Sequence, residues 1–211
     1  MSLMGCSGTA PRTNAPQASE SASASASASP SASASASATA GALTEPGADR
    51  RLGETATVEW TPKEGVDGEL SITVDKLEST SYKQTFSGWK LDEATLARAP
   101  YFVRATIKND GDTDLGGYDV PLWGLDDEGN LVEAAAFKEP FKPCAVKTFP
   151  KPFAPGASVD ACLVMLVPDQ GKLVGVSFRP YEEFDPITWQ GDLTPYAAPK
   201  ASGSPSASPT S

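Results

Sequence analysis

The chain has 211 residues, with 17 Lys and Arg against 27 Asp and Glu, no His and three Cys, and its formal net charge is −10. This charge excludes a nucleic-acid-binding protein, because phosphate backbones are held mainly by clustered Lys and Arg. The absence of His removes the only side chain that titrates unperturbed near neutral pH, which is also the commonest metal ligand. Catalytic triads with His, His–metal sites and zinc fingers are therefore excluded, and we expect no cofactor.

The first residues contain a motif that is typical of bacterial lipoproteins. Leu3-Met4-Gly5-Cys6 resembles a lipobox, in which the peptide bond before Cys is cut and that Cys receives a lipid on its sulfur. We interpret residues 1–5 as the remnant of a lipoprotein signal and predict acylation of Cys6. This would anchor the protein to the cell membrane from the extracytoplasmic side without spanning it. An ordinary exposed Cys in a disordered tail is the alternative.

Residues 6–49 are predicted to form a disordered tether. From Ala18 to Ala40, Ser and Ala alternate almost without interruption. Such a stretch has no large side chain to bury, so it cannot offset the conformational entropy that ordering would cost. Residues 200–211 share this composition and are predicted to form a disordered tail.

Residues 50–199 contain all four Trp, all five Tyr and all eight Phe, and carry 15 Lys and Arg against 24 Asp and Glu. A segment of this length suits a single domain. Its longest apolar run, Ala161 to Val167, has seven residues, whereas a membrane-spanning helix needs about 20. We therefore assign the acidic charge to one folded domain that does not cross a membrane.

The hydrophobic pattern of this domain predicts an all-β fold. Leu70, Ile72 and Val74 alternate with polar residues, which is the period of half-buried antiparallel strands. Turn-forming clusters separate similar short runs, and seven or eight strands punctuated in this way predict an immunoglobulin-like antiparallel β-sandwich. One short helix is predicted from Leu91 to Arg98. The predicted strands are Thr55 to Trp60, Leu70 to Asp75, Tyr101 to Lys108, Tyr118 to Leu125, Asn130 to Phe137, Val159 to Val167, Leu173 to Arg179 and Ile187 to Gln190.

Two cysteines lie inside the domain. Cys144 and Cys162 enclose 17 residues, and Cys162 lies in the most apolar predicted strand. In an exported domain a disulfide is the expected pairing. Closing a loop of this size stabilises the fold by about 3 kcal/mol in the chain-entropy model. Two buried free thiols are the alternative for a cytosolic protein.

Five segments of the domain together point to a family. They are Tyr101 to Asp112, Val120 to Leu122, Asp126 to Gly129, Phe153 to Gly156 with Cys162, and Phe184 to Trp189. They resemble the telokin-like, immunoglobulin-like domain of secreted lipoproteins of actinobacteria, over roughly Arg51 to Gly191. The resemblance implies a surface-anchored β-sandwich and adds no catalytic residue.

Acidic clusters offer candidate metal sites. Asp110, Asp112 and Asp114 have the spacing that opens a calcium loop, but an EF-hand also needs Gly at its sixth and Glu at its twelfth position. The chain has Leu and Pro there, which excludes an EF-hand and leaves a looser calcium site or a solvated turn. Residues 126–128 are expected at a hairpin tip, with metal binding as the alternative.

Two motifs offer candidate catalytic groups. Ser87 and Lys90 match S-x-x-K, but the partner motifs of penicillin-binding enzymes are missing. Glu182, Glu183 and Asp185 could supply the acid and base of a small extracytoplasmic hydrolase. The alternative is that these three carboxylates are solvated at the end of a sandwich.

Three aromatic residues, Tyr82, Phe86 and Trp89, crowd the connection before the predicted helix. Flat amphipathic rings on a loop suit sugars, peptides or protein partners, so they form a possible ligand platform. The alternative is that this connection folds over one end of the sandwich, with Trp89 capping the core, whereas the other three Trp are expected in the core. The sequence thus predicts a lipid-anchored, non-catalytic binding module that contacts the membrane through Cys6 and an envelope or protein partner through its domain.

Overall fold

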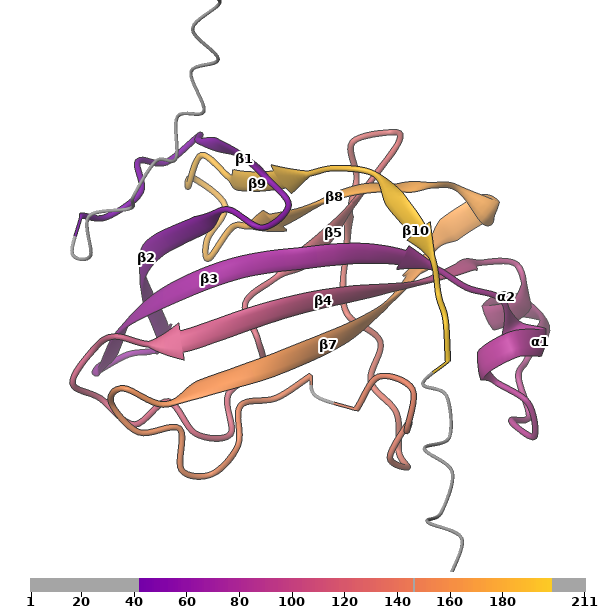
Figure 1. Cartoon of the computed structure of the whole chain (residues 1–211), viewed down its shortest axis with the longest axis horizontal. Coiled ribbons are helices and arrows are strands. Elements are labelled where there is room, and N and C mark those ends of the chain that lie inside the picture. Colours follow the sequence, from indigo (N-terminus) through magenta and orange to yellow (C-terminus); the bar gives the residue numbers. More distant parts are fainter. Residues whose placement is uncertain (1–41, 146, 199–211) are drawn as a thin grey trace, which may run out of the picture. The chain divides into compact units, whose positions relative to one another are not determined.

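Two β-sheets pack face to face in the computed structural model, which describes residues 42–145 and 147–198 (Figure 1). Sheet A has the strand order β1-β9-β8-β5-β6, and sheet B has the order β10-β3-β4-β7, with β2 also paired to β3. The elements are β1 (Asp49–Arg51), β2 (Thr55–Lys63), β3 (Val66–Ser79), α1 (Tyr82–Thr85), α2 (Glu93–Leu96), β4 (Ala99–Asn109), β5 (Trp123–Asp126), β6 (Leu131–Val132), β7 (Ser158–Val167), a 3-10 turn (Pro168–Gln170), β8 (Leu173–Phe178), β9 (Ile187–Gln190) and β10 (Leu193–Pro195).

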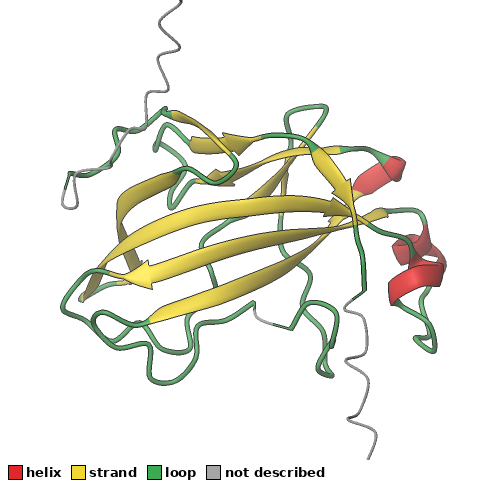
Figure 2. Ribbon diagram, in the orientation of Figure 1, coloured by secondary structure: helices red, strands yellow, loops and turns green. Residues whose placement is uncertain are grey.

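This arrangement confirms the predicted immunoglobulin-like β-sandwich. The pairing of β4 with β7 in one sheet, and of β5, β8 and β9 in the other, corresponds to the B–E and C–F–G pairings of immunoglobulin domains. At the edges, β1 runs parallel to β9 and β10 runs parallel to β3. Strands account for most of the fold, and the short helices gather at one end of the sandwich (Figure 2).

The core lies between the sheets and follows the predicted alternation. Leu70, Ile72 and Val74 of β3 are fully buried and pack in the same cluster as Phe178 and Trp189 of sheet A. The Trp189 indole N–H donates to the carbonyl of Glu54 at 2.9 Å, which satisfies its polar group inside the core. Each such side chain contributes about 1.5 to 3 kcal/mol by leaving water. Trp123, in contrast, is only half-buried, so the expectation that it belongs to the core is wrong.

Two of the predicted strands are much shorter than expected. The run from Tyr118 to Leu125 forms a strand only from Trp123 onward, and the run from Asn130 to Phe137 forms one only at β6. Val120 and Leu122 are nevertheless buried, at 6% and 3% exposure. An alternating apolar pattern indicates which side chains are buried. Val120 and Leu122 are buried without being part of a β-strand.

The helical region differs from the prediction in a similar way. The helix expected from Leu91 to Arg98 is limited to α2, whose N-cap Asp92 accepts a hydrogen bond from the Thr95 N–H at 2.8 Å. A second short helix, α1, was not predicted, and Ser81 caps it by accepting from the Gln84 N–H at 3.2 Å. Both turns are capped locally, and α1 also packs Tyr82 on Phe86, which is only 3% exposed.

The folded part begins before the predicted boundary at residue 50. The Thr44 N–H donates to the Thr57 carbonyl at 2.7 Å, and the Gly47 N–H donates to the Asp185 carbonyl at 2.9 Å. Cys6, the rest of the predicted tether up to residue 41, and the tail from residue 200 lie outside the described residues. None of the described helices is long and apolar enough to cross a bilayer.

A second apolar cluster covers the outer face of sheet B, and we call it the outer cluster. It contains Phe102 and Val164, which point away from the core on β4 and β7. Phe102 is fully buried. The members of the outer cluster are Phe86, Phe102, Phe141, Cys144, Cys162, Val164 and Tyr196.

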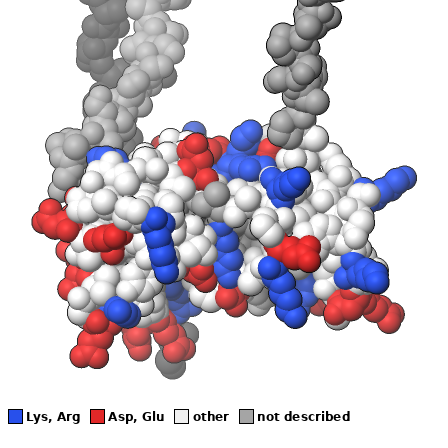
Figure 3. Space-filling model, turned by 90° about the horizontal axis from the view of Figure 1, so that it is seen from below, with Lys and Arg blue, Asp and Glu red and all other residues white. Residues whose placement is uncertain are grey.

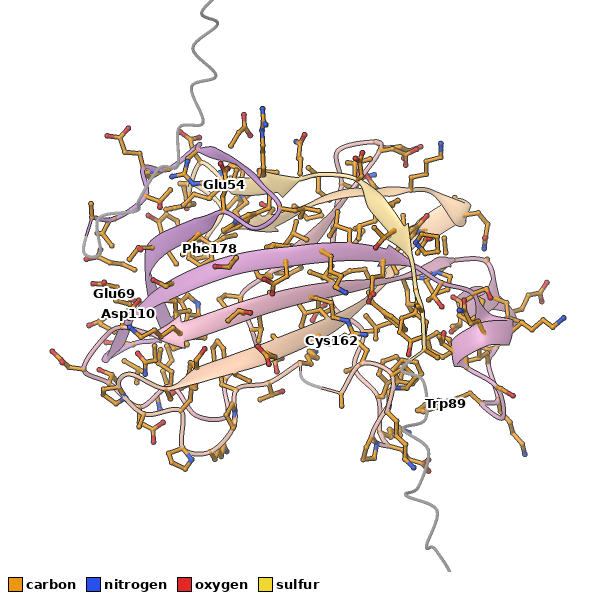
Figure 4. All side chains as sticks on the ribbon, viewed as in Figure 1. Glu54, Glu69, Trp89, Asp110, Cys162 and Phe178 are labelled. Carbon is orange, nitrogen blue, oxygen red and sulfur yellow. A yellow bond between two sulfur atoms is a disulfide. The ribbon has the colours of Figure 1, made fainter. Side chains whose placement is uncertain are left out.

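The predicted disulfide joins Cys144 and Cys162 within the outer cluster, with 5.1 Å between their Cα atoms. Cys162 lies on β7 (Figure 4), and Cys144 lies in the long connection between β6 and β7. In antibody domains the conserved disulfide joins the two sheets. Here it instead fastens a connecting segment to the outer face of one sheet.

We expect the double substitution Cys144→Ala/Cys162→Ala to lower the free energy of unfolding by about 3 kcal/mol, because it releases a closed loop in the unfolded chain. Urea unfolding measures this loss. Hydrogen exchange should accelerate most at residues 135–145 and least in β5 and β8. Cys6→Ala is the matched control and should change neither quantity, and an unchanged free energy for the double variant would contradict the assigned role.

Candidate binding surface

The structure brings Tyr82, Phe86 and Trp89 together, but as a packed group. The Phe86 ring centre lies 5.2 Å from that of Tyr82, and the Phe141 ring stacks on Phe86 at 4.5 Å. Trp89 packs edge-on against Phe137 and Phe141, at 5.4 and 5.6 Å. Phe86 is only 3% exposed. A ligand would therefore reach only the outer parts of the half-buried Tyr82 and Trp89.

The carboxylates of Asp110, Asp112 and Asp114 do not converge. Asp110 pairs with the Lys108 ammonium, whereas Asp114 accepts hydrogen bonds from two backbone N–H groups at 2.8 and 2.9 Å. Partial burial raises the pKa of Asp110, but hydrogen bonds from Lys108 and Ser71 and the Lys108 charge outweigh it, so the pKa lies below its ordinary value. Within residues 42–145 and 147–198, no three His, Cys, Asp or Glu side chains are arranged to hold a metal ion.

The acidic hairpin tip between β5 and β6 is built around Asp126. Its carboxylate accepts from the N–H groups of Glu128 at 3.0 Å and Asn130 at 2.7 Å, and from the Asn130 side-chain amide at 3.0 Å. Desolvation raises the pKa of Asp126, but these hydrogen bonds outweigh it and hold the pKa below its ordinary value. Asp127 accepts from the Lys172 N–H at 2.9 Å. The carboxylates of Asp126 and Asp127 thus hold two turns in place.

The proposed catalytic residues lie at exposed positions. Ser87 and Lys90 are exposed, as are Glu182, Glu183 and Asp185 on the connection between β8 and β9. Among the described hydrogen bonds and ion pairs, none joins Ser87 to Lys90 or involves the side chains of these three acids. The structure therefore does not assemble a buried acid and base from them.

Two aromatic residues beside these acids, Tyr181 and Phe184, contribute to a surface that the sequence reasoning missed. We call it the Tyr181 groove, a depression of about 590 Å³. Of the four large hydrophobic side chains that are exposed within residues 42–145 and 147–198, two line it, Leu43 at 45% and Tyr181 at 60% exposure. The Tyr181 ring is held edge-on by Phe184 at 5.5 Å, and Phe184 packs on the core residue Phe178 at 5.6 Å. The signal that could have found it is an aromatic pair in a Pro-bounded loop without strand alternation.

Polar groups surround the apolar floor of this groove. Its apolar lining is Leu43, Pro46, Val58, Pro180, Tyr181 and Phe184, and its polar lining is Thr44, Glu45, Glu59 and Thr61. Glu45 and Glu59 are exposed, and neither takes part in an ion pair within the described part of the chain. An apolar pocket with a few polar groups is the usual chemistry of a binding site.

A second depression, of about 840 Å³, lies on the outer face of sheet B, and we call it the Arg104 groove. Arg104 donates to Glu78 at 2.9 Å and to the Pro143 carbonyl at 3.0 Å, and its guanidinium lies 5.7 Å from the Phe102 ring centre. Glu78 is only 6% exposed. These three contacts hold Arg104 in one position. The Arg104–Glu78 ion pair thus borders the outer cluster on the β3 side.

Charges of both signs surround the outer cluster. The Arg104 groove is lined by three acidic and three basic residues, namely Asp75, Glu78, Asp160, Lys76, Arg104 and Lys142. The face formed by the β7 edge and the connection after β6 likewise mixes Lys and Arg with Asp and Glu (Figure 3). In contrast to the Tyr181 groove, these surfaces present no single charge sign.

No family model and no curated protein matches the sequence. The resemblance to telokin-like lipoprotein domains therefore stays a prediction. Among solved structures, a secreted protein from Mycobacterium tuberculosis, MPT63, is 14% identical and superposes with a TM-score of 0.44. The match covers 68% of this chain and 96% of that chain.

We expect Trp89→Ala to lower the free energy of unfolding by about 2 kcal/mol, less than the 3 to 5 kcal/mol of a fully buried Trp, because Trp89 is half-buried. Thermal and urea unfolding measure the effect. Leu96→Ala, at a side chain that is 49% exposed, is the control and should stay within about 0.5 kcal/mol of the unmodified protein. Equal stability of both variants would show that Trp89 does not cap the outer cluster.

We expect Asp126→Ala to destabilise the fold by about 1 to 3 kcal/mol, because two backbone N–H groups and the Asn130 amide lose their acceptor. Since the folded-state pKa lies below the ordinary value of 3.8, the contribution is present above that pH and is lost as the pH falls through the folded-state pKa. The stability difference between the two proteins should therefore narrow in acid. Asp112→Ala, at an exposed carboxylate, is the control, and a difference that widened in acid would contradict this role.

Proposed function

We propose that the protein is a lipid-anchored, extracytoplasmic lipoprotein whose β-sandwich acts as a non-catalytic binding module, with the Tyr181 groove as its binding surface. The observation that carries this proposal is the concentration of exposed apolar side chains, Tyr181 and Leu43, in one groove with a polar rim. Exposed aromatic rings held rigid by packing are typical of interaction sites.

The proposed location is supported by two features of the chain. Cys6 follows Gly5 in a lipobox-like motif, and 42 residues, 7–48, separate it from the first strand. A flexible chain of about this length has an r.m.s. span of roughly 35 to 40 Å, enough to hold a domain clear of lipid headgroups. The Cys144–Cys162 disulfide is in turn typical of oxidising compartments outside the cytoplasm.

A binding role is favoured over catalysis by the chemistry of the available groups. The chain contains no His, so a general acid would have to be a carboxyl group whose pKa is raised by burial. Glu182, Glu183 and Asp185 are all exposed, so none of them has the buried position that such an acid requires. The hydrolase alternative thus lacks a suitable acid at these positions.

Photocrosslinking in cells that produce the protein tests the binding surface. A photoreactive residue at position 181 should give a discrete adduct with one envelope component, identified by mass spectrometry. The same residue at position 174, an exposed site on β8 that lies outside the groove lining, is the control and should not give that adduct. Identical adduct patterns at both positions, or no adduct at 181, would contradict the proposal.

Intact-mass measurement of membrane-extracted protein tests the anchor separately. We expect a chain that begins at Cys6 and carries the mass of a diacylglyceryl group. Cys6→Ser should release the protein from the membrane fraction, whereas Cys144→Ala/Cys162→Ala should not. An unmodified Cys6 would contradict lipid anchoring and leave the binding surface unaffected.

A further inference from the structure

The Tyr181 groove lies along the unpaired edge of β2. β2 pairs with β3 on one side only. On its other side, the extended segment at Thr44 already meets the strand: the Thr44 N–H donates to the Thr57 carbonyl at 2.7 Å, and the Thr57 N–H donates to the Thr44 hydroxyl at 3.0 Å. This edge of β2 therefore already accepts an extended segment at Thr57.

The next pairing position along this edge is Glu59. Glu59 lies opposite Glu69 in the ladder, and the Glu69 carbonyl accepts from Asp110 and Gly111 on the β4 side, at 2.8 and 3.2 Å. Figure 4 shows Glu69 beside Asp110 at this end of sheet B. Backbone groups alternate between the two edges of an antiparallel strand, so Glu69 and Glu59 point away from each other. The N–H and C=O of Glu59 thus face the groove, and no described residue outside the sheet bonds to them.

The acidic lining of the groove favours an incoming strand with positive charge. Glu45 and Glu59 are the only charged residues in its lining within the described part of the chain. The connection that supplies Tyr181 carries the exposed acids Glu182, Glu183 and Asp185 against one basic residue, Arg179. A cationic side chain is attracted both to these carboxylates and to the face of an aromatic ring. A second copy of this acidic chain would place like charges against each other at this edge, which is unfavourable.

We propose that an extended peptide segment carrying Lys or Arg adds to the free edge of β2 beyond Thr57. Its backbone pairs with Glu59, and its cationic side chain lies between the Tyr181 ring and the carboxylates of Glu45 and Glu59. This is recognition by strand addition, in which backbone hydrogen bonds supply affinity and side-chain pockets supply specificity. The assignment rests on the proposed function, since it names the class of partner for the same groove.

A synthetic peptide of alternating Val and Lys tests this with the full-length protein. We expect binding by calorimetry at low ionic strength, and no binding of the same peptide with Glu in place of Lys. Methylation of the peptide N–H groups on one edge should weaken binding at least about tenfold, or 1.4 kcal/mol. Equal binding of the methylated peptide would show attraction by charge alone and would overturn strand addition.

Variants of the protein provide the matched comparison. Tyr181→Ala and Glu45→Gln/Glu59→Gln should each weaken binding of the Lys peptide about tenfold. Val174→Ala and Glu64→Gln, which change an exposed apolar side chain and an exposed charge outside the groove lining, should not. An equal loss of peptide binding in the two control variants would show that the peptide does not bind in the Tyr181 groove.

The outcome can be separated from that of the proposed function. If no peptide binds while crosslinking at position 181 still captures an envelope component, strand addition fails and the binding role stands. An adduct with a second copy of the chain, or a crosslink from position 181 to residues 1–41, would likewise identify a different occupant and overturn the peptide assignment.

Discussion

The pairing of β4 with β7, continuous from Ala99 against Val167 to Lys108 against Ser158, is the interaction on which the rest of the structure depends. These strands are covered on both faces over part of their length. Val103 and Leu163 face the main core, whereas Phe102 and Cys162 face the outer cluster. The two apolar clusters therefore share one pair of strands. The Cys144–Cys162 disulfide fastens the connection after β6 to the middle of this pair, where Cys162 lies opposite Arg104.

The outer face of sheet B is partly covered by the outer cluster, so the exposed apolar surface lies at another place on the domain. Three groups cover one part of that face: the aromatic residues Tyr82, Phe86 and Trp89, the connection after β6, and the Arg104–Glu78 ion pair. Desolvating an ion pair costs free energy, which is offset only when further hydrogen bonds satisfy its polar groups. Here Arg104 also donates to the Pro143 carbonyl. The Tyr181 groove lies elsewhere, at the β2 edge, where the Tyr181 side chain is 60% exposed.

Sequence patterns located burial more reliably than backbone pairing. The alternation at Leu70, Ile72 and Val74 identified both the strand and its buried face. At Val120 and Leu122 the same kind of alternation identified buried side chains but not their conformation, because side chains can leave water without a ladder beside them. The burial of Phe102 in the outer cluster was not predicted, since a strand pattern cannot reveal that a distant connection covers the outer face of the sheet.

The sequence by itself determined the all-β sandwich, the pairing of its two internal cysteines and the exclusion of His-dependent chemistry, because composition and short-range periodicity carry that information. Only the tertiary structure decided which aromatic residues are closed in and which are open. Exposure depends on contacts between segments far apart in the chain: Phe141 stacks on Phe86, whereas Tyr181, in the equally aromatic loop before β9, is held by Phe184 on one edge and remains exposed.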